Sequence, residues 1–265
     1  MSPESHVPHK VVVKIGGSTL GAHDTTLQDL VTLQRQGTIP VVVHGGGAVV
    51  TQWLEKQGVP TRFVRGLRVT DAESLQVVTA VLAGLVNKEL VAGLLGFGGK
   101  AVGISGIDGA IIEGRIQDPE LGFVGEVAKV NLGPLEALTA AGYIPVVSTL
   151  GYNPIARDGE GPTTLNLNAD TVAGELAATQ GADRLVFLTD VAGVQDKEGR
   201  VLSHLTPAQA RSLLESGAAS GGMIPKLEAC LRASSKGTES WIVDGRAEHM
   251  LLTALSPSPI GTRVG

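Results

Sequence analysis

The chain has 265 residues, of which 43% are hydrophobic, and a formal net charge of −5. That acidic balance argues against nucleic acid or an anionic membrane surface as a partner. The one cysteine, Cys230, excludes an intrachain disulfide and favours a reducing, cytoplasmic location. The polar N-terminus shows no signal-peptide pattern, and we expect no apolar run long enough to cross a membrane.

Apolar runs typical of buried strands alternate with stretches typical of helices along the whole chain. In chain order, the pattern predicts strand 10–15, helix 25–36, strand 39–44, helix 48–57, helix 72–95, strand 100–104, helix 132–141, strand 143–148, helix 169–180, strand 184–189, helices 207–216 and 225–235, strand 240–243 and helix 247–255. Such alternation predicts a mostly parallel sheet with helices on both faces. We expect one domain, with an internal seam between Gly181 and Ala182.

Two stretches depart from this alternation. Residues 109–130 alternate in polarity and are broken by Gly and Pro, which predicts antiparallel hairpins at one edge of the sheet or as a lid. Residues 152–167 are expected to form a loop or a hairpin. The sequence has no Walker-type phosphate loop and no Cys and His cluster with metal-ligand spacing, so we predict no metal site built by the protein.

Two of the predicted strands end in glycine turns. Lys14 stands just before Gly16 and Gly17, and His44 stands just before the run Gly45–Gly47. Backbone N–H groups without neighbouring side chains bind anions, and a helix that starts at the second turn adds its positive end. A lysine at the end of a buried strand is costly unless its charge is used. We interpret the two turns as a phosphate cradle, with tight turns and a solvated lysine as the alternative.

Polar residues mark the starts of two further predicted helices. Arg68 precedes the helix at 72–95, where it suits a carboxylate ligand, although a surface pair with an aspartate fits the local sequence equally well. Asn166 and Asp170 open the helix at 169–180. They serve there either as helix caps or as groups that face a ligand and hold a nearby lysine.

A second acidic residue and a second lysine follow later in the chain. Asp190 comes directly after Thr189, at the carboxyl end of a predicted strand, where open α/β sheets bind ligands. Lys226 follows a glycine turn at the start of a helix, where the helix dipole disfavours a cation unless an anion is bound. Two glycine turns, two lysines and an aspartate together suit phosphoryl transfer by positioning and charge neutralisation.

Taken in order, these motifs resemble those of the amino acid kinase family over residues 10–263. The matching segments are Lys14–Gly17, His44–Gly47, Gly66–Thr70, Ala83–Lys88, Asn166–Asp170, Thr189–Val191 and Gly222–Lys226. The resemblance implies a three-layer αβα sandwich around an eight-stranded, mostly parallel open sheet. It also implies an N-terminal lobe, residues 10–181, that binds an acylated amino acid and dimerises, and a C-terminal lobe, residues 182–265, that binds ATP.

The resemblance also implies a role for each matched residue. Lys14 and Lys226 would stabilise the phosphoryl group in transfer and contact ATP, and Asp170 would hold both lysines. Gly16 and Gly17 would donate N–H groups to phosphoryl oxygens. The remaining expected contacts are Gly46, Gly47, Arg68 and Asn166 for the acceptor, and Thr189, Asp190 and Met223 for ATP. Mg²⁺ would bridge the phosphates.

Within the family, the motifs are most similar to members that use ATP to phosphorylate the γ-carboxylate of N-acetyl-L-glutamate in arginine biosynthesis. One alternative is a kinase for aminoadipate or glutamate carried on a small acidic protein, which the lack of a lysine or arginine cluster disfavours. A non-catalytic amino acid sensor on the same fold is another. Aspartate kinase is disfavoured because no regulatory domain follows residue 265.

The resemblance finally implies a homodimer. Arginine-inhibited members carry an extra N-terminal helix that links dimers into hexamers, whereas nine residues precede the first predicted strand here. We therefore expect a dimer that arginine does not strongly inhibit.

Overall fold

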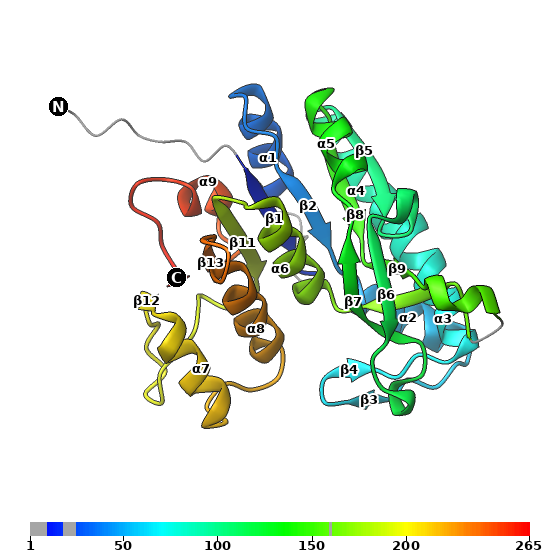
Figure 1. The fold of residues 1–265 in the computed structure, drawn as a ribbon. Coiled ribbons are helices and arrows are strands. Elements are labelled where there is room, and N and C mark those ends of the chain that lie inside the picture. Colours follow the sequence, from blue (N-terminus) through cyan, green and yellow to red (C-terminus); the bar gives the residue numbers. More distant parts are fainter. Residues whose placement is uncertain (1–9, 18–24, 159–160) are drawn as a thin grey trace.

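The computed structural model describes residues 10–17, 25–158 and 161–265. The nine residues on which the expectation about arginine rests lie outside these ranges. A central sheet of eight strands, in the order β12-β14-β13-β11-β1-β2-β8-β5, separates two layers of helices (Figure 1). Its neighbouring strands are all parallel except β13 and β14. The strands are β1 (Val11–Ile15), β2 (Val41–His44), β5 (Ala101–Ser105), β8 (Ile144–Ser148), β11 (Arg184–Thr189), β12 (His204–Leu205), β13 (Glu239–Asp244) and β14 (Thr262–Val264).

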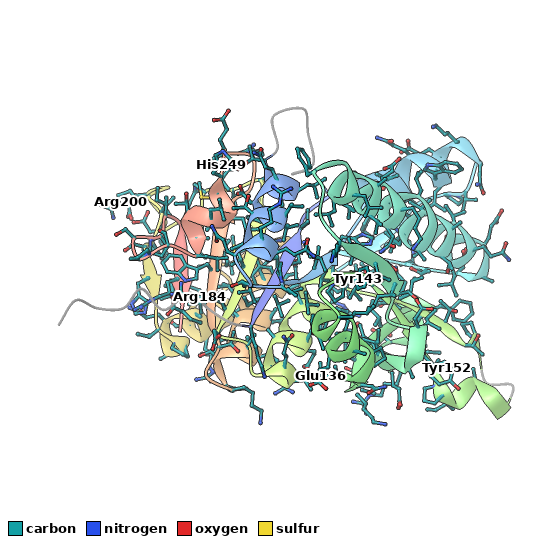
Figure 2. The ribbon with its side chains drawn as sticks, turned by 90° about the horizontal axis from the view of Figure 1, so that it is seen from above. Glu136, Tyr143, Tyr152, Arg184, Arg200 and His249 are labelled. Carbon is teal, nitrogen blue, oxygen red and sulfur yellow. The ribbon has the colours of Figure 1, made fainter. Side chains whose placement is uncertain are left out.

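Each face of the sheet carries its own apolar core, because successive side chains of a strand point to opposite faces. Val11 and Val13 pack in one core and Val12 in the other. The first core is covered by α1 (Thr26–Arg35), α2 (Gly47–Lys56), α3 (Ala72–Thr79), η1 (Ala80–Val86), α4 (Asn87–Gly96) and α9 (Met250–Ala254), and the second by α5 (Gly133–Ala140), α6 (Ala169–Gln180), α7 (Pro207–Glu215) and α8 (Met223–Ser234). Seen from above, His249 beside α9 and Glu136 in α5 lie on opposite sides of the sheet (Figure 2). The predicted αβα sandwich is confirmed.

The long helix predicted at 72–95 is continuous but changes its winding. Asp71 caps it by accepting a hydrogen bond from the Ser74 N–H at 2.8 Å. Its middle, η1, is a π-helical turn between α3 and α4. By length and composition alone, this helix is long and apolar enough to cross a membrane. The expectation that the chain has no apolar run of that length was therefore wrong. However, 44% of the apolar window is buried inside the protein, and α4 packs on β5 and β8. It is a helix of the core.

The predicted hairpins form a small barrel of their own. β6 (Ile112–Ile116) and β7 (Val124–Val130) are antiparallel as expected, and so are β9 (Leu150–Tyr152) and β10 (Thr164–Leu167). Parallel pairing of β7 with β10 and of β6 with β9 then closes the four strands, so the hairpins do not extend an edge of the large sheet. Gly125 and Gly151 leave room for Leu165 and Leu167, whose atoms would otherwise lie within 2.8 Å of an added Cβ.

Several short elements were not predicted, because two to five residues are too few to show a periodicity. Besides β12 and β14, they are β3 (Phe63–Val64) and β4 (Leu67–Arg68), which form a two-stranded hairpin, and the 3-10 turns η2 (Asp108–Ala110), η3 (Pro119–Leu121) and η4 (Pro154–Asp158).

Helices α6 and α8 pack against each other more closely than side chains normally allow. A Cβ added at Gly174 of α6 would lie 2.8 Å from the Cα and Cβ of Ala229 in α8. Backbone atoms cannot yield as a flexible side chain does, so glycine at 174 sets the distance between the two helices.

We therefore expect Gly174→Ala to destabilise the protein by about 1–3 kcal/mol through overpacking, despite the higher helix propensity of alanine. Gly96→Ala in α4 is the matched control, because a Cβ there meets nothing within 4 Å. It should leave stability unchanged or raise it by up to about 1 kcal/mol. Urea unfolding of both variants measures the difference, and equal effects would contradict the packing argument.

Candidate active site

Two lysines from distant parts of the chain share one buried carboxylate. The Lys14 Nζ on β1 lies 2.8 Å from Asp170 Oδ1, and the Lys226 Nζ on α8 lies 3.2 Å from Asp170 Oδ2. The three side chains are only 8–12% exposed. The side chain of Asn168 caps α6 by accepting from the N–H groups of Asp170 and Thr171, which fixes the start of the helix that carries Asp170. The expected contact of Asp170 with both lysines is present.

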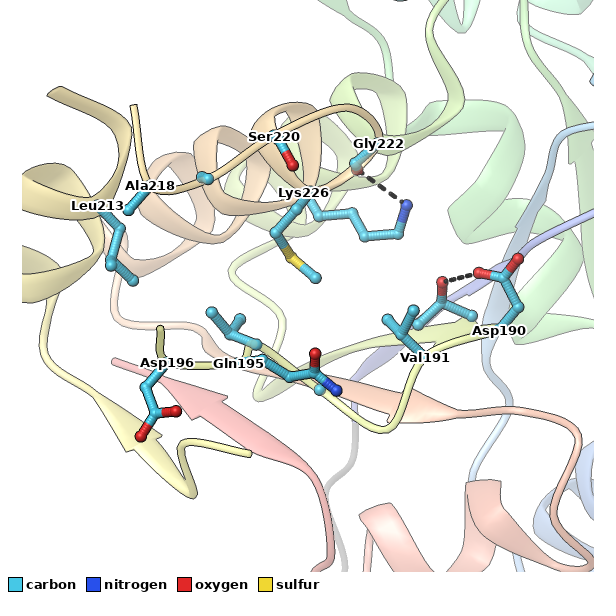
Figure 3. Close-up of a pocket in the computed structure, with 14 residues that line it drawn as sticks. Asp190, Val191, Gln195, Asp196, Leu213, Ala218, Ser220, Gly222 and Lys226 are labelled. Carbon is cyan, nitrogen blue, oxygen red and sulfur yellow. Dashed lines mark hydrogen bonds between the residues drawn. The ribbon is translucent and has the colours of Figure 1, made fainter. Parts of the chain in front are cut away.

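On one side of this cluster lies a cavity of about 430 Å³ between β11 and α8, here called the β11–α8 cavity (Figure 3). Its lining includes Thr189, Asp190, Met223 and Lys226. The Thr189 hydroxyl donates to Asp190 at 3.2 Å, and the Lys226 ammonium also donates to the Gly222 carbonyl at 3.1 Å. All the residues expected for ATP after residue 180 therefore meet in one place, at the carboxyl end of β11.

On the other side lies a cavity of about 250 Å³, here called the glycine cavity. Its lining brings together residues from several elements: Lys14, Gly17, Gly46, Gly47, Arg68, Asn166 and Asp170. The two glycine turns lie side by side, since a Cβ at Gly17 would be 3.5 Å from the Gly46 Cα. The residues expected to hold the acceptor are thus assembled around one cavity.

Arg68 and Asn166 are held in place by neighbouring polar groups. The Arg68 guanidinium donates to the Gly47 carbonyl at 2.9 Å and to the Thr51 hydroxyl at 2.7 Å, and burial lowers its pKa. These bonds and one to Thr61 occupy three of the five N–H donors of the guanidinium. The Asn166 amide donates to Thr70 at 3.0 Å. The alternative in which Arg68 pairs with an aspartate on the surface is wrong, because Arg68 is buried against the start of α2.

One expected contact does not match this structure. The Gly16 N–H donates to the Leu188 carbonyl at 3.1 Å and so extends the pairing of β1 with β11 by one residue. Gly16 lines neither the glycine cavity nor the β11–α8 cavity. The Gly16 N–H, which was expected to face a phosphoryl oxygen, is thus bonded within the sheet. Gly17 is the first glycine of this turn that lines a cavity.

This arrangement can be compared with known proteins. A model of the amino acid kinase family matches residues 9–244. The chain belongs to the amino acid kinase family. An acetylglutamate kinase from Dehalococcoides mccartyi (strain CBDB1) is 49% identical over 97% of this chain and 94% of that protein. An acetylglutamate kinase from Prochlorococcus marinus (strain MIT 9313) is 44% identical over 96% of this chain and 84% of that protein. The crystal structure of smu.665 from Streptococcus mutans UA159 superposes with a TM-score of 0.82 at 28% identity, over 97% of this chain and 98% of that one.

Several residues that line the two cavities of this amino acid kinase family member carry no signal in the sequence. Phe63 and Leu82 line the glycine cavity, and Gln195 and Asp196 line the β11–α8 cavity. Phe63 lies in the unpredicted hairpin, where the Arg68 guanidinium stacks 4.9 Å from its ring centre. Leu82 lies in the π-helical turn. No motif signals these positions, because the tertiary fold alone brings them to the cavities.

The shared carboxylate leads to a stability prediction. We expect Asp170→Ala to destabilise the protein by about 3 kcal/mol or more, because it leaves two buried ammonium groups close together without a counter-charge. Glu175→Ala is the matched control. Glu175 lies on the same helix and accepts from Arg232 of α8 at 2.8 Å in a more exposed pair, so its loss should change stability by at most about 1 kcal/mol. Similar losses in denaturant titrations of the two variants would contradict the role given to burial.

Proposed function

We propose that the protein transfers the γ-phosphoryl group of ATP to the γ-carboxylate of N-acetyl-L-glutamate, a step of arginine biosynthesis. The observation that carries the proposal is the Lys14–Asp170–Lys226 cluster, of which Lys14 and Asp170 line the glycine cavity and Lys226 lines the β11–α8 cavity. The two acetylglutamate kinases that match this chain almost end to end support the choice of acceptor.

In this proposal each cavity takes one substrate. The β11–α8 cavity is the larger and has Lys226 at one side, which suits a nucleotide polyphosphate. The glycine cavity offers N–H groups at the start of α2 together with Arg68 and Asn166, which suits a small acceptor with two carboxylates. The lining of the glycine cavity comes from residues 14–170 and that of the other from residues 189–226. This division supports an N-terminal lobe, 10–181, for the acceptor and a C-terminal lobe, 182–265, for ATP.

The proposed chemistry needs charge neutralisation more than acid–base catalysis. The acceptor carboxylate is already a nucleophile, so one of its oxygens bonds to the γ-phosphorus while the bond from that phosphorus to the β-phosphate oxygen breaks. An acyl phosphate and ADP are the products. Both reactants are anions, and their repulsion is the main obstacle to approach. Two lysines and one aspartate leave a net charge of +1 beside the path of transfer, and Lys14 and Lys226 would stabilise the transferring group.

We further propose that Mg²⁺ accompanies ATP and lowers the charge on its phosphates. In the described part of the chain, no group of three or more His, Cys, Asp and Glu side chains is close enough to hold a metal ion. Mg²⁺ usually takes one or two carboxylates and fills its remaining positions with phosphate oxygens and water. Asp190, which lines the β11–α8 cavity, is an acidic group available on that side.

We also propose that the enzyme is a cytoplasmic homodimer. The dimer is supported by the family resemblance, and the location by the single cysteine, which favours a reducing compartment.

Substrate specificity tests the proposal directly. Acyl phosphate formed from ATP and each acceptor is trapped with hydroxylamine and measured as the hydroxamate. We expect N-acetylglutamate to exceed glutamate, aspartate and aminoadipate in kcat/KM by at least about 100-fold, because an acceptor that leaves buried polar groups unpaired loses several kcal/mol. A preference for carrier-bound glutamate or aminoadipate, or no product with any acceptor, would instead favour the carrier-protein kinase or the sensor.

The role of the second lysine is tested in the same assay. Lys226→Ala should lower kcat by at least about 100-fold while the protein stays folded, because it removes a charge beside the transferring phosphoryl group. Lys236→Ala, just beyond the end of the same helix, is the control and should leave kcat unchanged, since Lys236 lines neither cavity. Near-wild-type hydroxamate formation by Lys226→Ala would rule out this mechanism.

A further inference from the structure

A buried histidine stands immediately before the glycine run of the acceptor cavity. His44 ends β2 and is 1% exposed. Its Nδ1 lies 2.9 Å from the Gly45 carbonyl oxygen, and its Nε2 lies 3.1 Å from the Asn87 side-chain nitrogen. Burial lowers the pKa of His44 from 6.5 to about 4, and the nearby charge of Lys88 acts in the same direction. The ring is therefore neutral near pH 7 and carries a single N–H.

The surroundings of Asn87 decide which ring nitrogen carries that proton. The Asn87 amide nitrogen also faces the carbonyls of Val146 at 2.9 Å and Ile104 at 3.3 Å, while its oxygen accepts from the Lys88 ammonium at 2.9 Å. Reversing the amide would set its oxygen against two carbonyl oxygens and its nitrogen against a cation. The amide has two N–H groups, which serve its two nearer acceptors, the Val146 carbonyl and His44 Nε2. The proton of the ring therefore sits on Nδ1, which donates to the Gly45 carbonyl.

This hydrogen bond fixes a whole peptide unit. In a planar trans peptide, the carbonyl of Gly45 and the N–H of Gly46 point in opposite directions. With the carbonyl held toward His44, the Gly46 N–H points away from the ring. Gly46 is the N-cap of α2, so its N–H has no partner within the helix, and both Gly46 and Gly47 line the glycine cavity.

The π-helical turn supplies both sides of this arrangement. Asn87 follows directly after η1, whose wider winding shifts the register of the residues beyond it. Leu82, inside the same turn, packs so closely on Gly46 that an added Cβ would lie 2.7 Å from its methyl carbon. One irregular turn thus places the amide that orients His44 and the side chain that presses on the glycine loop.

We propose that His44, held as its Nδ1–H tautomer by Asn87, is a positioning residue that presents the Gly46 N–H to a carboxylate of the acceptor. His44 touches neither substrate and takes no proton in the reaction. The inference rests on the proposed function, since it assigns the Gly46 N–H to that acceptor.

The tautomer is tested without substrate. Long-range ¹H–¹⁵N correlation spectra of the wild-type protein distinguish a protonated Nδ1 from a protonated Nε2. We expect an Nδ1–H ring for His44 that does not titrate between about pH 5.5 and 8. A ring protonated at Nε2, or one that takes up a second proton in that range, would overturn the inference even in an active enzyme. An Nδ1–H ring in an enzyme that does not phosphorylate N-acetylglutamate would overturn the proposed function, and with it the acceptor assigned to the Gly46 N–H, but would leave the tautomer in place.

Two amide variants then separate the two bonds of the ring. His44→Asn keeps an N–H near the Nδ1 position, whereas His44→Gln places its amide near Nε2 and loses the bond to Gly45. We expect His44→Gln to lower kcat/KM for N-acetylglutamate by about 10- to 100-fold, with the KM for ATP within about twofold, and His44→Asn to recover most of this loss.

A purely structural role gives a different result. It would lower the unfolding midpoint of both variants and impair their use of ATP as well as of N-acetylglutamate. Denaturant titration and the KM for ATP of the same two variants measure these effects. Equal impairment of His44→Asn and His44→Gln, or an unchanged kcat/KM for N-acetylglutamate in His44→Gln, would overturn the positioning role.

Discussion

The site depends on keeping two ammonium groups beside one carboxylate with little water around them. Lys14 and Lys226 repel each other, and both lose hydration when buried, so Asp170 must lie between them. Three elements bring these groups together: the centre of the sheet carries Lys14, and two helices packed at the distance of a glycine contact carry the others. A chain with a net charge of −5 thereby holds a small positive region, which shows that local charge and overall charge are separate quantities.

Much of this arrangement is predictable because chemistry and strand ends coincide in the sequence. Lys14, His44 and Thr189 each end an apolar run, and the carboxyl ends of neighbouring parallel strands meet at one edge of a sheet. The layers are predictable as well, because apolar runs that alternate with helical stretches indicate a parallel sheet covered by helices on both faces. A cap such as Asp71 is also visible locally, since its effect reaches only three residues along the chain.

The remainder depends on contacts between segments far apart in sequence. Closure of the barrel follows from leucines of β10 that fill space beside glycines of other strands, and no local pattern records that match. Whether a glycine N–H pairs with the sheet or faces a cavity is likewise decided by the neighbouring strand, as Gly16 shows. The π-helical turn is hidden for another reason: its residues continue the apolar pattern of the long helix, and that pattern does not show where the winding widens.

The place of Lys14 within β1 has a consequence for motion. Its backbone pairs with Val43 on one side and Phe187 on the other, so moving it means breaking two ladders at the centre of the sheet. Lys226, in contrast, lies on α8, in a helical layer outside the sheet, and Arg68 lies on the two-stranded hairpin of β3 and β4. The backbone of Lys14 is therefore the part of the site that is hardest to displace, whereas Lys226 and Arg68 are carried by elements outside the centre of the sheet.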